Sequence, residues 1–169
     1  MLVIFGGLPG TGKSTIARQL AERLRACYLR IDTIEEAIRT SGVLAPGAEV
    51  GPAGYITTYR LAADNLRMGA WVLADSVNPL KITRDAFREV AERAGVAFLE
   101  VETICSDVEE HRRRVEERSS DTEGHTPPSW EAVRTRRYEA WDRPRLQIDT
   151  ATSPIAQSVD RIIRSLPRR

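Results

Sequence analysis

Residues 7–14 read Gly-Leu-Pro-Gly-Thr-Gly-Lys-Ser, and this stretch decides the fold. It matches the phosphate-loop pattern, a glycine, any four residues, then Gly-Lys and a serine or threonine, at every fixed position. The flanking residues have the character that such a loop requires. Residues 1–5 are an apolar run typical of a buried strand, and residues 15–25 place apolar side chains at helical spacing. The sequence therefore predicts a strand, a glycine turn and a helix.

The loop predicts a site for the phosphates of ATP together with Mg²⁺. Glycines let the backbone curl until successive N–H groups point at phosphate oxygens, and the helix N-terminus adds partial positive charge. Lys13 is expected to bridge the β- and γ-phosphates, Ser14 to ligate Mg²⁺, and Thr15 to reach the α-phosphate. The expected nucleotide-binding residues of the loop are Gly7, Leu8, Pro9, Gly10, Thr11, Gly12, Lys13, Ser14 and Thr15. The alternative is a glycine-rich turn that binds nothing.

The small number of lysines supports the phosphate site and also argues against GTP as the nucleotide. Lys13 and Lys81 are the only lysines, so a lysine in the loop is not a by-product of abundance. A GTPase needs an Asn-Lys-x-Asp element to recognise guanine, and Lys81 does not stand in one. The Asp-x-x-Gly run at residues 121–124 lies inside a polar break, residues 119–129, and follows no strand, so we interpret it as a coincidence. The usual guanine reader is therefore excluded.

Apolar and amphipathic segments alternate along the rest of the chain. Strands are expected at residues 1–5, 27–31, 71–74, 96–104 and 146–148. Helices are expected at about 15–25, 33–39, 55–68 and 83–94, from a capping box at 106–109 to 118, at 130–138, and from 153 onward. This alternation predicts an α/β fold of three layers, with helices on both faces of a five-stranded parallel sheet. Without a repeat or linker, residues 1–169 are expected to form one domain.

Composition argues against several kinds of partner. The chain has 25 basic and 24 acidic residues, so it has no overall attraction for nucleic acid or anionic lipid. Its longest apolar run, residues 1–5, is too short to span a bilayer and leads into the glycine loop rather than a cleavage site, so a cytoplasmic location is expected. Cys27 and Cys105 lack the spacing of a metal site or redox pair and are interpreted as buried, reduced thiols.

Asp75 follows the apolar run at residues 71–74, where a buried strand would place a carboxylate beside the phosphate loop. Such a carboxylate commonly holds magnesium, so Asp75 and Ser14 are the candidate metal residues. The alternative is an ordinary aspartate that caps a turn. Hydrolytic ATPases often follow this aspartate with a second acidic residue that activates water, and Ser76 stands there instead. The pattern favours transfer of phosphate over hydrolysis.

Asp32 ends the second expected strand, directly before a helix. One interpretation is structural, because aspartate is a favoured N-cap. The other is functional, because the carboxyl end of this strand opens on the same crevice as the phosphate loop in a parallel sheet. A carboxylate there can accept the proton of a substrate hydroxyl as it attacks the γ-phosphate. Asp32 is therefore a candidate catalytic residue.

Arg114 and Arg118 are four residues apart and share a face of the helix expected before the polar break. Arginines neutralise charge on a transferring phosphoryl group, and a flap that carries them also excludes water. They complete the candidate catalytic set with Lys13 and Asp32. The alternative is a surface network of ion pairs with nearby glutamates, which are Glu109, Glu110, Glu116 and Glu117.

With these features the chain resembles the small phosphate-loop kinases, the group that holds gluconate and shikimate kinases, chloramphenicol phosphotransferase and zeta-toxin-like kinases. It looks most similar to the short bacterial kinases described as AAA family ATPases. The resemblance covers nearly the whole chain and is carried by residues 6–15, 31–32, 72–79, 111–118, 138–144 and 148–150.

The resemblance implies a sheet ordered 2-3-1-4-5, a lid at about residues 112–130 and an acceptor-binding segment at about residues 32–68. It also implies that Arg112 or a neighbour lies against adenine, and that the loop after residues 149–150 closes the base pocket. One departure matters: residues 40–59 contain no arginine that would hold a carboxylate acceptor of the gluconate or shikimate type. A neutral or hydroxyl-rich acceptor is therefore favoured.

Together these features predict an ATP- and magnesium-dependent kinase that transfers the γ-phosphate to a hydroxyl of a small molecule, as a monomer or homodimer. Two alternatives stay open. One is a switch module that binds ATP and has no dedicated acceptor. The other is a kinase of a polynucleotide or a cell-wall precursor. The near-zero net charge argues against nucleic acid, although a local patch of arginines keeps it open: Arg134, Arg136, Arg137, Arg143 and Arg145.

Overall fold

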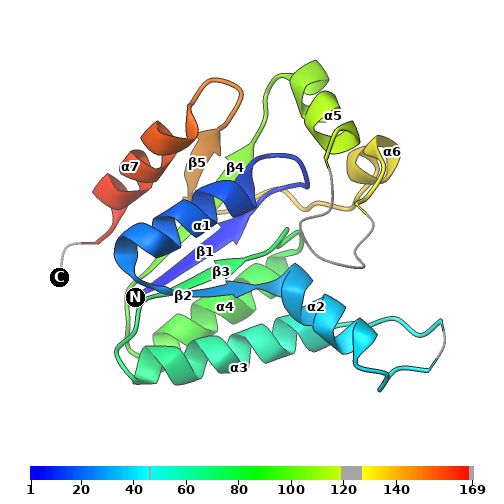
Figure 1. Cartoon of the computed structure of the whole chain (residues 1–169). Coiled ribbons are helices and arrows are strands. Elements are labelled where there is room, and N and C mark those ends of the chain that lie inside the picture. Colours follow the sequence, from blue (N-terminus) through cyan, green and yellow to red (C-terminus); the bar gives the residue numbers. More distant parts are fainter. Residues whose placement is uncertain (46, 119–126, 168–169) are drawn as a thin grey trace.

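The computed structural model describes residues 1–45, 47–118 and 127–167 (Figure 1). Within these residues one sheet of five parallel strands has the order β2-β3-β1-β4-β5. The strands are β1 (Leu2–Gly6), β2 (Cys27–Arg30), β3 (Val72–Asp75), β4 (Phe98–Ile104) and β5 (Leu146–Asp149). The helices are α1 (Lys13–Leu24), α2 (Ile31–Thr40), α3 (Ala53–Arg67), α4 (Lys81–Arg93), α5 (Val108–Glu116), α6 (Trp130–Arg134) and α7 (Ile155–Ser165). The expected fold class and strand order are confirmed.

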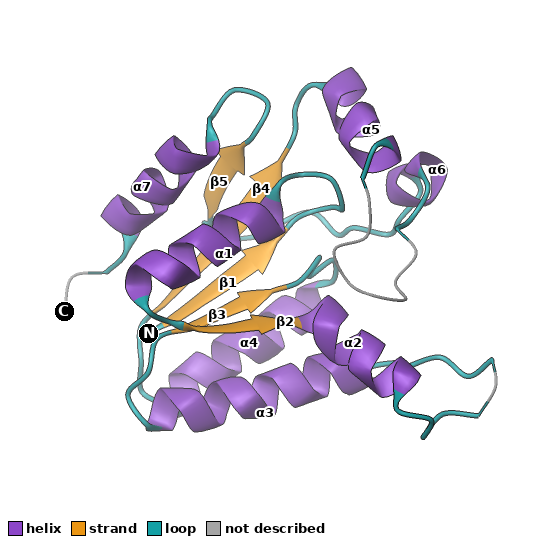
Figure 2. Cartoon of the chain, in the orientation of Figure 1, coloured by secondary structure: helices purple, strands orange, loops and turns teal. Residues whose placement is uncertain are grey.

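The central strand β1 explains the layering, because it is buried along its whole length. Alternate side chains of a strand point to opposite faces. Val3 and Phe5 belong to a core shared with α1 and α7, whereas Leu2 and Ile4 belong to a core shared with α3 and α4. Figure 2 shows these two helix pairs on opposite sides of the sheet. A strand with two apolar faces therefore requires a helix layer on each side.

The parallel arrangement brings every strand's carboxyl end to one edge of the sheet. The phosphate loop follows β1 at this edge, and α2 follows β2. In Figure 1, α5 and α6 lie beyond the end of β4 at the same edge. Segments far apart in sequence can therefore meet around the phosphate loop, as in other open α/β sheets.

Two helix boundaries near this edge differ from the prediction. Helix α5 is capped by Asp107, whose side chain accepts a hydrogen bond from Glu110 N, and not by Ser106. The Ser106 hydroxyl instead donates to Asp149 Oδ2 at 2.5 Å, so a tertiary contact removes the predicted cap. Helix α6 ends at Arg134 rather than near Tyr138, because Tyr138 turns away to donate a hydrogen bond to Glu102 on β4.

Two expectations from composition can also be compared with the structure. Among the described helices, none is long and apolar enough to pass through a bilayer. Cys27 and Cys105 are free thiols, as expected, but both are half-buried rather than fully buried.

Candidate functional site

The phosphate loop depends on glycines at places where no other residue fits. Gly7, Gly10 and Gly12 all have positive φ, at 142°, 85° and 76°. A Cβ at Gly7 would lie 2.4 Å from the carbonyl oxygen of Thr103, and one at Gly10 would lie 2.5 Å from a methyl group of Val115. Both conformation and packing therefore demand glycine here. The loop ends at Gly12, the N-cap of α1, so the first turn of that helix faces the loop.

The loop and the start of α1 surround a hollow of about 280 Å³. Its described lining includes four cationic side chains and no carboxylate, so its charge suits a polyphosphate. The lining residues are Leu8, Pro9, Gly10, Gly12, Lys13, Ser14, Thr15, Arg18, Arg114 and Arg118. The structure thus brings the expected Lys13, Ser14 and Thr15 together with both expected lid arginines.

Lys13 and Asp75 form a buried ion pair beside this hollow, with Lys13 Nζ 3.1 Å from Asp75 Oδ1. Tyr28 donates a hydrogen bond to Asp75 Oδ2 at 2.5 Å. Burial alone would raise the pKa of Asp75, but Lys13 and hydrogen bonds from Tyr28 and Ser14 outweigh burial and hold this pKa below its ordinary value. Asp75 therefore stays ionised at neutral pH.

These donors fit Mg²⁺, which prefers hard oxygen ligands. Asp75 Oδ1 is buried and receives no well-directed hydrogen bond within the described residues. Its contact with Lys13 Nζ is an ion pair at 3.1 Å. Ser14 lies within hydrogen-bonding reach of the same carboxylate. In the described part of the chain, no group of three or more His, Cys, Asp and Glu side chains forms a metal cluster. Phosphate oxygens and water would therefore have to complete the coordination shell, as in other phosphate-loop proteins.

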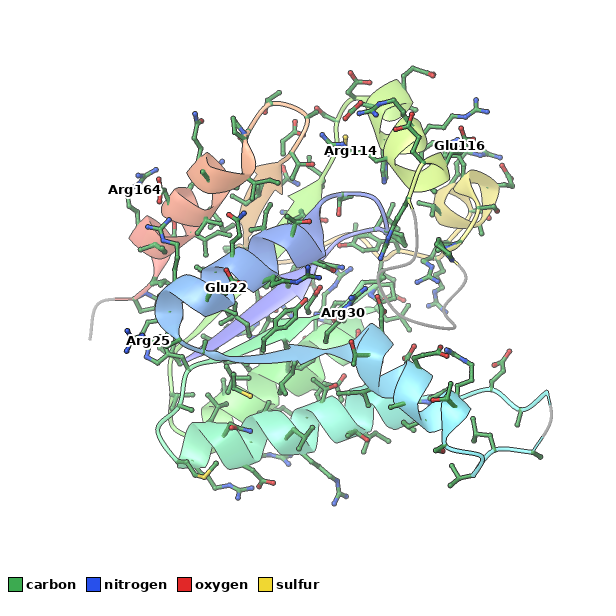
Figure 3. The ribbon with its side chains drawn as sticks, viewed as in Figure 1. Glu22, Arg25, Arg30, Arg114, Glu116 and Arg164 are labelled. Atoms are coloured by element: carbon green, nitrogen blue, oxygen red, sulfur yellow. The ribbon has the colours of Figure 1, made fainter. Side chains whose placement is uncertain are left out.

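Helix α5 is tied to the phosphate loop through Thr150, which follows β5. Arg114 donates from Nη1 to Thr150 Oγ1 at 2.9 Å and from Nη2 to Thr150 O at 3.2 Å. The Thr150 hydroxyl lies 3.1 Å from the carbonyl oxygens of both Thr11 and Ile104, one of which takes its proton. Figure 3 shows Arg114 on α5 and Arg30 at the end of β2, both at the carboxyl edge of the sheet. Arg114 also donates from Nε to Glu110 Oε1 at 2.7 Å, so its guanidinium is held between a glutamate of α5 and the residue that contacts the phosphate loop.

His111 makes a second contact between α5 and the phosphate loop. Its Nε2 lies 2.8 Å from the carbonyl oxygen of Pro9, and its ring meets Trp130 edge-on with the centroids 5.2 Å apart. A carbonyl oxygen can only accept, so Nε2 carries the proton. His111 therefore joins α5 to the loop, and α6 packs on α5 through the same ring.

Asp32 lies in the first turn of α2, and its Oδ2 is 3.6 Å from Arg30 Nη2. Arg30, not Asp32, is the N-cap of this helix, so the capping interpretation of Asp32 is wrong. Arg30 pairs in register with Asp75 on β3, which in turn pairs with Phe5 on β1. Asp32 therefore lies two residues beyond the strand end that neighbours Asp75, at the same edge of the sheet as the phosphate loop.

Known proteins that resemble the chain identify the family to which this site belongs. The family model described as an AAA domain matches residues 2–144. The chain belongs to this family. A probable adenylyl-sulfate kinase from Aeropyrum pernix is 28% identical to this AAA-domain protein, with 94% of this chain and 88% of the relative covered. The expected relationship to small phosphate-loop kinases is confirmed.

Solved structures share the fold of this AAA-domain protein. Kti12 from Chaetomium thermophilum, in complex with ADP-AlF3, has a TM-score of 0.71 at 24% identity, with 99% of this chain and all of that chain covered. A gluconokinase from Sinorhizobium meliloti has a TM-score of 0.61 at 19% identity, with 96% and 93% covered. At these identities the likeness is one of fold alone.

Arg112 differs from the other two arginines that were predicted for the site of this AAA-domain protein, Arg114 and Arg118. It is exposed, donates to Glu116 Oε1 at 2.9 Å and does not line the hollow. Arg18 lines the hollow instead, one helical turn beyond Ser14. The part of the expected lid at residues 119–126 lies outside the described residues.

The arginines of residues 134–145, which left a polynucleotide acceptor possible, mostly form ion pairs with carboxylates. Buried Glu100 pairs with Arg143 at 2.8 Å, and buried Glu102 pairs with Arg145 at 2.9 Å. The other pairs are Arg134 with Glu131 and Arg137 with Glu139. Guanidinium groups that already face carboxylates release few counterions from a phosphate backbone. This patch therefore gives no support to binding of a polynucleotide.

Sequence reasoning missed Arg84, a buried arginine on α4 whose partners are all carbonyl oxygens rather than carboxylates. Its guanidinium donates to the carbonyls of Asn78, Pro79, Glu139 and Ala140, at 3.0, 3.1, 2.7 and 3.3 Å. It also lies over the Trp141 ring, 4.3 Å from its centroid. Arg84 therefore holds the loop after β3 against residues 139–141. The sequence did not indicate that Arg84 is buried, because it is one of 23 arginines and stands in no recognisable motif.

The Thr150 contact leads to a testable prediction. Replacing Thr150 with valine keeps the shape but removes the hydroxyl that joins Arg114 to the loop, so the affinity for ATP should fall by about 10-fold. The Thr150→Ser variant keeps the hydroxyl and should bind within about twofold of the parent. Calorimetric titration with Mg-ATP measures both. Equal ATP affinity of the valine variant and the parent would show that the contact has no part in binding.

Proposed function

We propose that this protein is an ATP- and magnesium-dependent kinase that transfers the γ-phosphate to a hydroxyl group of a small molecule. One observation carries the proposal: a cationic hollow at a phosphate loop is bordered by the buried Lys13–Asp75 pair. Membership of the family and relatives named as kinases agree with it. ATP is the expected phosphate donor, since the usual guanine reader is absent from the sequence.

In the proposed reaction, the acceptor's hydroxyl oxygen forms a bond to the γ-phosphorus while the bond to the β,γ-bridging oxygen breaks and ADP leaves. Asp32 accepts the hydroxyl proton. Lys13 binds the β- and γ-phosphate oxygens, and Arg114 and Arg118 neutralise charge on the transferring group. Magnesium, when held by Ser14 and Asp75, neutralises phosphate charge. Positioning and electrostatic stabilisation therefore account for catalysis.

The test is a metabolite-pool screen for ATP consumption, with the phosphorylated product identified by mass. The parent should consume ATP with at least one acceptor, and Lys13→Ala should not. Tight ATP binding without acceptor-stimulated turnover would reject the kinase and favour the switch module. Phosphorylation only of an oligonucleotide or a cell-wall precursor would favour the other alternative.

The role of Asp32 gives a separate prediction. The Asp32→Asn variant should lose about 100-fold in kcat with the acceptor found in the screen, because the amide cannot accept the hydroxyl proton. Its affinity for Mg-ATP in calorimetry should match that of the parent. Asp160→Asn, at an exposed pair with Arg23, is the matched control and should leave kcat unchanged. An undiminished kcat of Asp32→Asn would eliminate the base role.

A further inference from the structure

The loop after β3 holds a buried side-chain donor without a hydrogen-bond partner. Asn78 is 0% exposed, and its Nδ2 has no partner among the described residues. Buried polar atoms are nearly always hydrogen-bonded, so this donor needs a reason. Asn78 stands three residues after Asp75, whose carboxylate contacts Lys13. The spare donor therefore belongs to the loop that begins at the strand end beside the phosphate loop.

This loop is held in place rather than free to collapse. Arg84 donates hydrogen bonds to the carbonyls of Asn78 and Pro79. The Asn78 side-chain oxygen accepts a hydrogen bond from Thr83 Oγ1 at 2.8 Å, which orients the amide and leaves Nδ2 as the spare donor. Fixed donors of this kind are characteristic of binding sites that are organised before the ligand arrives.

Tyr55 links this loop to α2. Its hydroxyl accepts a hydrogen bond from Asn78 N at 3.2 Å and lies within hydrogen-bonding reach of the Ser76 hydroxyl. The pKa of Tyr55 is raised, chiefly by burial and also by the negative charges of Glu35 and Asp32, against the hydrogen bonds with Ser76 and Asn78, which lower it. The hydroxyl of Tyr55 thus lies among the loop after β3 and the two carboxylates of α2.

Asp32 and Glu35 are three residues apart and share a face of α2. The pKa of Glu35 is raised, chiefly by burial and then by the charge of Asp32. The stem of Glu35 packs so tightly on α3 that a Cβ at Gly54 would lie 2.5 Å from its Cγ. Within the described residues, no group donates a hydrogen bond to the Glu35 carboxylate, so this acceptor is available to a ligand.

The cations around this cluster already face carboxylates. Arg30 lies 3.6 Å from Asp32, and Arg39 forms an ion pair with Glu36. Arg136 acts electrostatically on Glu35, whose pKa it lowers against the larger effect of burial. An anionic acceptor would have to compete for these cations and lie beside two negative charges. The cluster therefore disfavours a carboxylate or phosphate on the acceptor.

The hydrogen-bonding groups themselves define the ligand chemistry. Asp32 and Glu35 can accept hydrogen bonds, whereas Asn78 Nδ2 can donate one. A hydroxyl group both donates and accepts, but an ammonium group only donates and a carboxylate only accepts. We propose that the acceptor is a compound without a carboxylate or phosphate that has at least two hydroxyl groups, one bound by Asp32 and a second by Glu35. This inference rests on the proposed kinase function and makes Glu35 a specificity-determining residue.

The experiment begins with the acceptor from the mass-identified screen, which should carry at least two hydroxyls and no carboxylate or phosphate. Glu35→Gln should raise KM for this acceptor by about 10-fold and leave kcat within about twofold, because a charged hydrogen bond to a non-reacting hydroxyl is weakened. Glu22→Gln, an exposed glutamate on α1 (Figure 3), is the matched control and should leave KM unchanged.

A deoxy analogue that lacks the second hydroxyl separates binding from a general structural effect. Parent and Glu35→Gln should show the same KM for this analogue, because the hydrogen bond is absent in both. An anionic acceptor turned over normally, or a KM unaffected by Glu35→Gln, would overturn the inference and leave the proposed kinase intact. No turnover with any acceptor would reject the kinase, and with it this inference.

Discussion

Replacing Lys13 with alanine should abolish ATP binding detectable by calorimetry and lower acceptor-dependent turnover by about 1,000-fold or more. Lys13 is buried and is the only described lysine that lines the hollow. Its ammonium group lies beside Asp75, at the end of the loop whose backbone would cradle the phosphates. Without it, the hollow loses the one cation that the phosphate loop itself supplies, and the negative charge of Asp75 is left to repel the nucleotide.

Controls separate this effect from loss of folding, because the variant leaves the buried Asp75 carboxylate without its cation. Lys13→Arg keeps the charge but cannot reproduce the compact ammonium group, so it should fold and still bind ATP poorly. Lys81→Ala removes the only other lysine, a half-exposed side chain paired with Asp142 at 2.7 Å, and should leave turnover unchanged. Circular dichroism reports folding for all variants. ATP binding by Lys13→Ala at the parent's affinity would remove the basis for the proposed function.

The parts of the fold that the sequence predicted are those encoded locally. Residues 7–14 carry their own backbone requirements, and residues 1–5 have two apolar faces, so the loop and the central strand need no knowledge of distant contacts. The position of Asp75 at a strand end was predicted for the same reason, since it follows a buried apolar run. The strand order followed from the family resemblance rather than from any pattern in these residues.

The parts that the sequence did not reveal depend on contacts between distant residues. Thr150 joins Arg114 to the carbonyl of Thr11, across 36 and 139 residues. His111 reaches the carbonyl of Pro9 across 102 residues. Both contacts end on backbone carbonyl oxygens, which every residue possesses, so no pattern of side chains in the sequence predicts them. The predicted N-cap of α5 was wrong for a similar reason, because the Ser106 hydroxyl donates its hydrogen bond to the distant Asp149.

Arg84 is the clearest case of a residue whose importance only the structure reveals. It is 1% exposed, and its guanidinium satisfies four backbone carbonyls on two segments that the sequence separates by more than 50 residues. Trp141 and Tyr138 lie against the same guanidinium, with ring centroids 4.3 and 5.1 Å from its carbon. Arg84, together with Tyr55 and Thr83, therefore holds the loop that carries Asn78, and its side chain joins this loop to residues 139–141.

Arg84→Met should lower the free energy of unfolding by about 4 kcal/mol, because methionine fills part of the space but leaves buried carbonyls without donors. Arg93→Met, at a side chain 81% exposed on the same helix, is the matched control and should change it by less than about 0.5 kcal/mol. Urea denaturation followed by circular dichroism measures both. If Arg84→Met unfolds at the same urea concentration as Arg93→Met, water or a shifted backbone satisfies those carbonyls, and Arg84 does not hold the loop.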